Sequence, residues 1–212
     1  MNETRETKAL ILTDIQNDFL PGGALAVPEG DAVIAVANRL QNAFRLVVAT
    51  QDWHPPDHLS FAVNHPGKKE YEQIDLYGLT QTLWPVHCVQ GTSGAAFSVK
   101  LRQAKIAKVF QKGTDPTIDS YSGFFDNGHR KSTGMGEWLK AHGVDQIYLC
   151  GLATDYCVKF SALDAVRLGF KTFIVPDACR GINLRPEDSE EAVKEMQRAG
   201  VTVVESAELV DA

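Results

Sequence analysis

Cys157 combines a reactive residue type with a position that favours reactivity. It lies in the segment GLATDYCVKFSALDAVRLGF, after an apolar run that ends at Cys150 and at the start of a helix-patterned stretch. The first backbone N–H groups of a helix lack internal partners and lie at the positive end of the helix dipole. We therefore expect a lowered pKa for the Cys157 thiol and nearby N–H groups that can hold an oxyanion after attack on a carbonyl. Thr154 and Asp155 are expected to cap this helix, and Gly169 to end it.

Two other apolar runs lead into residues whose chemistry complements a thiol. Asp14 follows the first run in TDIQNDF, and Lys112 follows a later run in VFQKG. Because the carboxyl ends of parallel strands share one edge of a sheet, we expect these side chains to meet Cys157 there. A carboxylate can take the thiol proton, and an ammonium can stabilise the resulting anions. The three residues are a candidate triad, although a lone cysteine is usually a small buried apolar residue.

Asp18 is the rival to Asp14 for the proton-accepting role. It lies four residues further along the chain, beyond the expected end of the strand. An aspartate in such a place commonly holds a turn through its carboxylate. We therefore expect a structural role for Asp18 in its loop.

The segment TQDWHPPDH offers part of a metal site. Residues two apart in an extended chain point the same way, so Asp52 and His54 can reach one ion. A third ligand is needed, and the residues leave His58, His65 and His87 open as candidates. A carboxylate with imidazoles suits Zn²⁺, Fe²⁺ or Mn²⁺, and the residue types do not choose among them.

The composition excludes several classes of partner. The 212 residues are 44% hydrophobic and 23% charged, as in an ordinary globular chain with one substantial core. The net charge is -6 and no run of Lys and Arg forms a basic face, so neither nucleic acid nor an anionic membrane is expected as a partner. No stretch has the length of a spanning helix, and the opening MNETRETK is unlike a signal peptide. We expect a small-molecule substrate and a cytoplasmic location, and the sequence is compatible with a homo-oligomer.

The other cysteines give no sign of chemistry. The four cysteines of the chain show no CxxC pairing, and a chain of this size needs no disulfide, so reduced thiols are expected. Cys150 lies within an apolar run and is expected in the core, whereas Cys88 and Cys179 are expected in loops.

Short apolar runs alternate with helix-period segments along the chain. Near-continuous apolar strands joined by amphipathic helices indicate a parallel sheet covered on both faces. We expect a doubly wound α/β fold with a mainly parallel six-stranded sheet, in a single domain over 1–212 with an ordered insertion at about 51–94. The expected strands are 9–13, 46–50, 107–111, 146–150, 172–175 and 202–204, and the expected helices are 31–42, 136–142, 156–168 and 186–199.

Five motifs, taken in order, resemble those of one known family. TDIQNDF, TQDWH, WPVHC, FQKG and GLATDYC together resemble the nicotinamidases, also called pyrazinamidases, of the isochorismatase-like hydrolase superfamily. The resemblance runs from about residue 9 to about residue 204 and implies that superfamily's Rossmann-like, three-layer fold. Each motif is short, but their order after the expected elements makes the combination specific.

The resemblance also implies roles for individual residues. Cys157 is then the nucleophile, Asp14 the general base and Lys112 the third member of the triad. The oxyanion hole is formed by the N–H groups of Ala153 and Cys157, with a cis peptide bond between Leu152 and Ala153.

The resemblance further implies one divalent metal ion, with Zn²⁺ expected first and Fe²⁺ or Mn²⁺ as alternatives. Its ligands fall on Asp52, His54 and His87, so the resemblance selects His87 as the third ligand. Some members of the family use an additional histidine at a position that resembles His58.

Aromatic residues in the loops near these motifs suit a flat ring as substrate. They are Phe19, Trp53, Trp84, Tyr121 and Phe124. The resemblance places Phe19, Trp84 and Tyr121 around a pyridine ring.

The implied reaction is hydrolysis of nicotinamide to nicotinate and ammonia through a thioester on Cys157, in NAD salvage, with pyrazinamide as a further substrate. Related amidases keep the triad without the metal, so an amidase for a non-aromatic amide or ureido substrate is one alternative. A protein of another class, a redox sensor or metal-binding protein that turns over no substrate, is the second. Sensing does not require Asp and Lys on adjoining strand ends, which favours hydrolysis.

Overall fold

The core of the molecule is a six-stranded parallel sheet. The computed structural model describes residues 7–210. The sheet contains β1 (Thr7–Thr13), β2 (Leu46–Asp52), β5 (Ile106–Lys112), β6 (Val144–Leu152), β7 (Lys171–Arg180) and β8 (Thr202–Val203). Their order is β5-β2-β1-β6-β7-β8, and every neighbouring pair is parallel. The predicted fold class is confirmed, and Cys179, which we expected in a loop, lies instead near the end of β7.

The central strands are apolar because helices cover both faces of the sheet. Ala9, Leu10, Ile11 and Leu12 of β1 are all fully buried. Burying a Leu or Ile side chain contributes about 1.5–3 kcal/mol, so these residues hold β1 in the core. The register ends β1, β2 and β6 at the same edge of the sheet.

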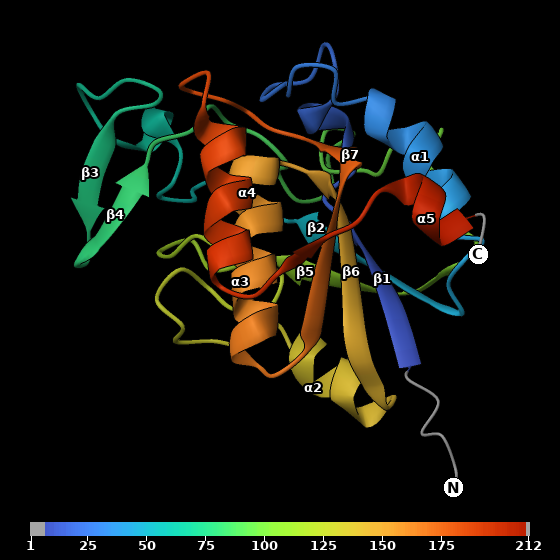
Figure 1. The fold of residues 1–212 in the computed structure, drawn as a ribbon. Coiled ribbons are helices and arrows are strands. Elements are labelled where there is room, and N and C mark those ends of the chain that lie inside the picture. The colour runs from blue at the N-terminus through green and yellow to red at the C-terminus, as the bar shows by residue number, and fades with distance from the viewer. Residues whose placement is uncertain (1–6, 211–212) are drawn as a thin grey trace, which may run out of the picture.

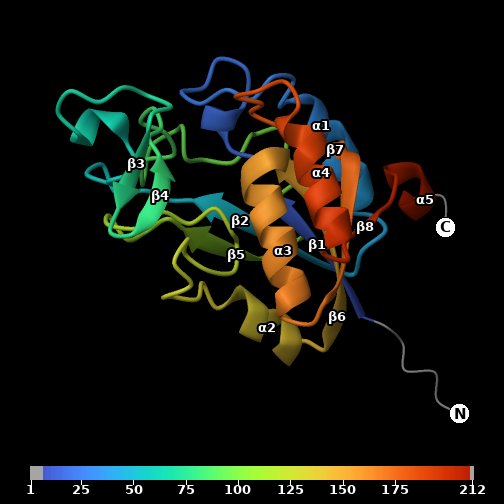
Figure 2. The same ribbon diagram turned by 60° about the vertical axis from the view of Figure 1, so that its left-hand side comes forward.

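Helices lie on both faces of this sheet (Figures 1 and 2). One face carries α1 (Ala32–Leu40) and the short α5 (Ser206–Val210), which contact each other. The other carries α2 (Met135–Ala141), α3 (Lys159–Arg167) and α4 (Asp188–Arg198). Within residues 7–210, none of the helices has both the length and the apolar character needed to cross a membrane.

The order in which strands are added to the sheet reverses between β1 and β6, although the two strands are parallel. From β1 the chain moves to β2 and β5 on one side, and from β6 it moves to β7 and β8 on the other. Loops that leave neighbouring strands in opposite directions open a crevice at the carboxyl ends, where ligands bind in folds of this type. Asp14 follows β1 directly, and β6 leads into the turn that carries Cys157.

The long connection after β2 contains a hairpin that the sequence pattern did not predict. β3 (Gln73–Leu76) and β4 (Leu79–Thr82) form a separate antiparallel pair that projects from one side of the sheet (Figure 1). Its two-residue turn, Tyr77 and Gly78, has positive φ at both positions (54° and 84°), as tight hairpin turns of this twist require. β2 itself runs on to Asp52, so the insertion begins slightly later than expected.

Candidate active site

The turn that carries Cys157 connects β6 to α3. The peptide bond between Leu152 and Ala153 is cis, as the resemblance implied. A π-helical turn, Thr154–Val158, follows and continues directly into α3. Cys157 lies in this turn and is only 6% exposed. Gly169, with φ 86°, follows the end of α3 as predicted.

The predicted helix caps at this turn are wrong. Ala153 occupies the N-cap position, and no side chain caps it. The carboxylate of Asp155 accepts hydrogen bonds from the backbone N–H groups of Ile182 (2.9 Å) and Asn183 (2.8 Å) instead. These two N–H groups belong to the loop after β7, so the carboxylate joins that loop to the cysteine turn.

Lys112 brings the predicted triad together. Its Nζ lies 3.0 Å from Asp14 Oδ2 and 3.4 Å from Cys157 Sγ. It also donates to the carbonyl oxygen of Ser120 (2.9 Å) and to Asp52 Oδ1. All of these side chains are buried, so the ammonium lies among two carboxylates and a sulfur with little screening by water.

Asp14 is positioned by the end of β1 and by the neighbouring strand. Its backbone adopts a left-handed conformation (φ 48°), which Asp tolerates better than most residues. Thr50 of β2 donates from Oγ1 to Asp14 Oδ1 across 2.7 Å. A carboxylate oxygen of Asp14, one of Asp52 and the sulfur of Cys157 all lie within 4.8 Å of one another. The base candidate is therefore beside the nucleophile candidate.

The electrostatics of the triad differ from the prediction. Burial raises the pKa of the Cys157 thiol well above its usual value; Lys112 offsets this in part, while Asp14 and Asp52 add to it. The lowered thiol pKa that we expected is thus wrong, because burial and the carboxylates of Asp14 and Asp52 raise it. Burial also raises the pKa of Asp14, again offset in part by Lys112. Burial alone would lower the pKa of Lys112, but Asp14 and Asp52 raise it well above its ordinary value.

Asp52, His54 and His87 form a group with the geometry of a metal site. One ligand atom from each lies within 4.8 Å of the others, and all three residues are buried. Nε2 of His54 lies 3.5 Å, and Nε2 of His87 3.7 Å, from Asp52 Oδ2. Nδ1 of His54 bonds the carbonyl oxygen of Gly113 (2.9 Å), and Nδ1 of His87 that of Pro85 (2.8 Å). Carbonyl acceptors place the proton on Nδ1 and leave Nε2 free to bind an ion.

The charge of Asp52 also suits a metal ligand. Burial alone would raise its pKa, but Lys112 and His54 hold that pKa well below the usual value. Lys112 engages Oδ1, so Oδ2 remains on the side of the two imidazoles. Gly113 fits closely beneath this group, because a Cβ there would lie 2.3 Å from the His54 ring. The donor set fits a divalent transition metal.

His58 and His65 lie outside that group of three. The ring of His58 is 4.5 Å from the ring of His54, and its potential ligand atoms group with those of His54 and Asp119. His58 Nδ1 accepts the backbone N–H of Ser60 (3.1 Å), which places the proton of a neutral ring on Nε2. Burial lowers the His58 pKa to about 4, so the ring is neutral at pH 7. His65 Nε2 bonds the carbonyl oxygen of Leu59 (2.7 Å) instead.

Three aromatic rings form a wall beside the cysteine turn. Trp84 meets Tyr156 edge-on at 4.9 Å, and Tyr121 meets Tyr156 at 5.3 Å. The Trp84 indole N–H donates to the Tyr121 hydroxyl across 3.2 Å. Of the other predicted aromatics, Phe19 packs on His87 (5.6 Å), and Phe124 lies fully buried in the core.

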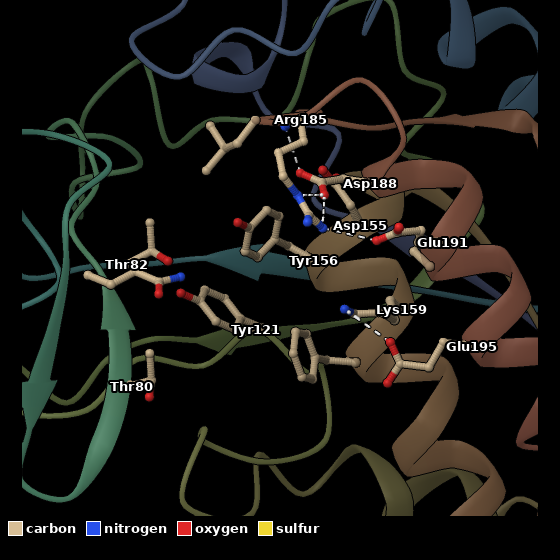
Figure 3. Close-up of a pocket in the computed structure, with 14 residues that line it drawn as sticks. Thr80, Thr82, Tyr121, Asp155, Tyr156, Lys159, Arg185, Asp188, Glu191 and Glu195 are labelled. Atoms are coloured by element: carbon tan, nitrogen blue, oxygen red, sulfur yellow. Dashed lines mark hydrogen bonds and ion pairs between the residues drawn. The ribbon is translucent and has the colours of Figure 1, made fainter.

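A cavity of about 600 Å³ lies on the hairpin side of this wall (Figure 3). Tyr121 and Tyr156 line it and point toward Thr82 of β4 (Figure 3). On its opposite side, Lys159 pairs with Glu195 at 3.4 Å, and Arg185 pairs with acidic residues of α4. Cys157 does not line this cavity. The candidate triad of Asp14, Lys112 and Cys157 therefore lies outside this cavity.

Some site residues escaped the sequence analysis. Tyr156 directly precedes Cys157, and an aromatic residue beside a candidate nucleophile was a usable signal. Gln16 is fully buried and holds the backbone of Asp52 at both ends, accepting from its N–H and donating to its carbonyl oxygen, each at 2.8 Å. Asp18 has the structural role expected of it, because its Oδ2 accepts the backbone N–H of Cys88 across 2.7 Å.

Comparison with known proteins places this chain in a family. The isochorismatase domain family matches residues 8–208. A nicotinamidase of Escherichia coli (strain K12) is 52% identical over 200 residues, which cover 92% of this chain and 93% of that protein. Among solved structures, a nicotinamidase and pyrazinamidase of Acinetobacter baumanii is 45% identical, with a TM-score of 0.94 over 98% of this chain and all of that one. A pyrazinamidase of Pyrococcus horikoshii in complex with zinc is 40% identical, with a TM-score of 0.76 over 93% of this chain and 98% of that one.

Proposed function

Because the chain belongs to the isochorismatase family, and its 52% identical relative is a nicotinamidase, we propose that it hydrolyses nicotinamide to nicotinate and ammonia through a thioester on Cys157. The observation that carries the proposal is Lys112, whose Nζ lies 3.0 Å from a carboxylate oxygen and 3.4 Å from the thiol sulfur. Hydrolysis of nicotinamide is a step of NAD salvage. Pyrazinamide has the same carboxamide on a similar ring and is a further substrate in this proposal.

The first half of the reaction forms the thioester. Asp14 takes the thiol proton as the sulfur of Cys157 bonds to the carboxamide carbon, and the carbonyl electron pair moves onto oxygen. The backbone N–H groups of Ala153 and Cys157 hold this oxyanion, and the ammonium of Lys112 stabilises it. Asp14 then gives its proton to the amide nitrogen, the C–N bond breaks, and ammonia leaves.

The second half releases nicotinate. Asp14 takes a proton from water as the water oxygen bonds to the thioester carbon. The C–S bond then breaks, Asp14 returns its proton to sulfur, and the carboxylic acid that is formed loses its own proton to water and leaves as nicotinate. The raised pKa values of Asp14 and Cys157 suit this cycle, because a buried thiol at rest needs a base beside it at the moment of attack.

The metal-ligand group of Asp52, His54 and His87 would hold one divalent ion. The proposal that this ion is zinc is supported by the donor set and by the zinc complex of the Pyrococcus relative. When bound, the ion supplies a Lewis acid that can hold the ring nitrogen, directly or through bound water. Phe19, Trp84 and Tyr121, together with Tyr156, supply apolar faces for the ring, and the Phe19 ring packs against His87.

Ammonia release from nicotinamide tests the proposal. Cys157→Ala is expected to lose activity by at least about a thousandfold, because it removes the thiol to which Lys112 Nζ donates and which lies beside the Asp14 carboxylate. Cys150→Ala, at a buried thiol away from the triad, is the matched control. Equal rates for wild type and Cys157→Ala would exclude the proposed mechanism.

A further inference from the structure

The hydroxyl of Thr50 binds the carboxylate oxygen of Asp14 that Lys112 does not pair with. Thr50 Oγ1 donates to Asp14 Oδ1 across 2.7 Å, and both residues are fully buried. The pairing of β1 with β2 brings Thr50 close to Asp14, because Thr50 lies opposite Thr13, the residue directly before Asp14. A β-branched side chain has few rotamers, so a strand backbone gives this hydroxyl a fixed position.

The two oxygens of Asp14 therefore have different surroundings. Oδ1 is engaged by Thr50. Oδ2 lies 3.0 Å from Lys112 Nζ. The same Nζ lies 3.4 Å from the sulfur of Cys157. Oδ2 is thus the oxygen that shares the ammonium with the thiol.

We propose that Thr50 is a positioning residue for the reaction: its hydroxyl keeps Oδ1 of Asp14 turned away and leaves Oδ2 to receive the thiol proton. The inference rests on the proposed role of Asp14 as the base. Without the hydroxyl, the attraction of the buried ammonium turns the carboxylate so that both oxygens face Lys112. Oδ2 then leaves the thiol, and proton transfer slows although every reacting group is still present.

Thr13 provides a matched control for this residue. It is fully buried and lies opposite Thr50 in the register. Its Oγ1 has no hydrogen-bond partner among residues 7–210. Replacing either threonine with valine removes one hydroxyl and keeps the branched shape, but only the change at Thr50 removes a contact with Asp14.

The test compares kcat and KM for nicotinamide in five variants: Thr50→Val, Thr50→Ser, Thr50→Ala, Thr13→Val and Asp14→Asn. We expect Thr50→Val to lower kcat about ten- to a hundredfold with KM within about threefold of wild type, because small displacements of a reacting group cost about this much. Thr50→Ser, which keeps the hydroxyl, and Thr13→Val are expected within about threefold of wild type in both constants. Thr50→Ser and Thr50→Ala differ by one hydroxyl. If Thr50→Val fails to fold, the ratio of their kcat values measures the effect of that hydroxyl instead.

The outcomes separate this inference from the function on which it rests. If Asp14→Asn is inactive while Thr50→Val matches Thr13→Val, or while Thr50→Ala matches Thr50→Ser, the positioning role is wrong and the base assignment stands. If Asp14→Asn keeps the wild-type kcat, the base assignment is wrong, and the role of Thr50 falls with it. An equal loss in Thr13→Val and Thr50→Val would also overturn the inference, because disturbed packing would then explain both.

Discussion

Cys157 and the two core cysteines Cys150 and Cys179 are all buried near one another in the sheet, but their surroundings differ. Cys157 follows β6, while Cys150 lies within β6 and Cys179 within β7, and all three are at most 6% exposed. Burial raises the thiol pKa of each one. Of these three, only Cys157 has the Lys112 ammonium 3.4 Å from its sulfur and the carboxylates of Asp14 and Asp52 grouped with it. Under the proposed mechanism, a base beside the thiol, and not a lowered thiol pKa, is what distinguishes Cys157 from these two core cysteines.

Removing the carboxylate beside Cys157 is expected to lower activity more than the changes that follow. An amide cannot take a proton from the thiol or pass it to the leaving nitrogen, so Asp14→Asn is expected to lower kcat about a thousandfold or more. Steady-state ammonia release measures the change. A kcat within tenfold of wild type would remove the distinction between Cys157 and the core thiols.

Removing the metal is expected to have the next largest effect. In a chelated, verified metal-free protein we expect ammonia release to fall about a hundredfold and Zn²⁺ to restore it, because holding the ring in the correct orientation lowers the barrier by several kcal/mol. His87→Ala should bind Zn²⁺ more weakly, while His65→Ala, whose ring bonds a carbonyl oxygen elsewhere, serves as the control. Full activity without metal contradicts the role of the metal-ligand group.

The pH dependence of thiol labelling sharpens the comparison further. Because the Cys157 pKa is raised well above its usual value, thiolate becomes more abundant as pH rises toward and past 9. Iodoacetamide labelling of Cys157, followed by peptide mass spectrometry, should therefore accelerate about tenfold per pH unit up to pH 9 without levelling off. A plateau below pH 8 would mean that the helix terminus lowers the pKa after all. Cys150 and Cys179 should stay unlabelled in the folded protein.

Changing a core thiol is expected to have the smallest effect on activity. Cys150→Ala should leave kcat within about twofold of wild type and lower the free energy of unfolding by about 1 kcal/mol, as a small core truncation does. Urea unfolding and the ammonia assay measure the two quantities. A hundredfold loss of kcat in a folded Cys150→Ala protein would give this residue a role that its surroundings do not support.

The positions of the residues at the strand ends were predictable from the sequence, whereas the pKa of Cys157 was not. Apolar runs marked β1, β5 and β6, and parallel strands align their ends, so Asp14, Lys112 and Cys157 could be placed together. The pKa of Cys157 depends on burial and on two carboxylates from other strands, which no local pattern encodes.

Contacts made by distant loops explain the other differences. The sequence predicts Asp155 as a helix cap, but its carboxylate accepts hydrogen bonds from the N–H groups of Ile182 and Asn183, on a loop far along the chain. The hairpin of β3 and β4 has strands of four residues each, which are too short for a clear alternation of apolar and polar residues. Thr50 could not be singled out, because its importance lies in the oxygen of Asp14 that it contacts.

The most direct test of the account is to identify the residue that carries the acyl group during turnover. Wild-type protein with Zn²⁺ and excess nicotinamide would be quenched in acid within the first turnovers, digested and analysed by mass spectrometry, with Cys157→Ala treated in the same way. The account predicts a nicotinoyl group on Cys157, none on Cys150 or Cys179, and neither adduct nor turnover in Cys157→Ala. A nicotinoyl group on another residue, or sustained turnover in Cys157→Ala, would contradict it.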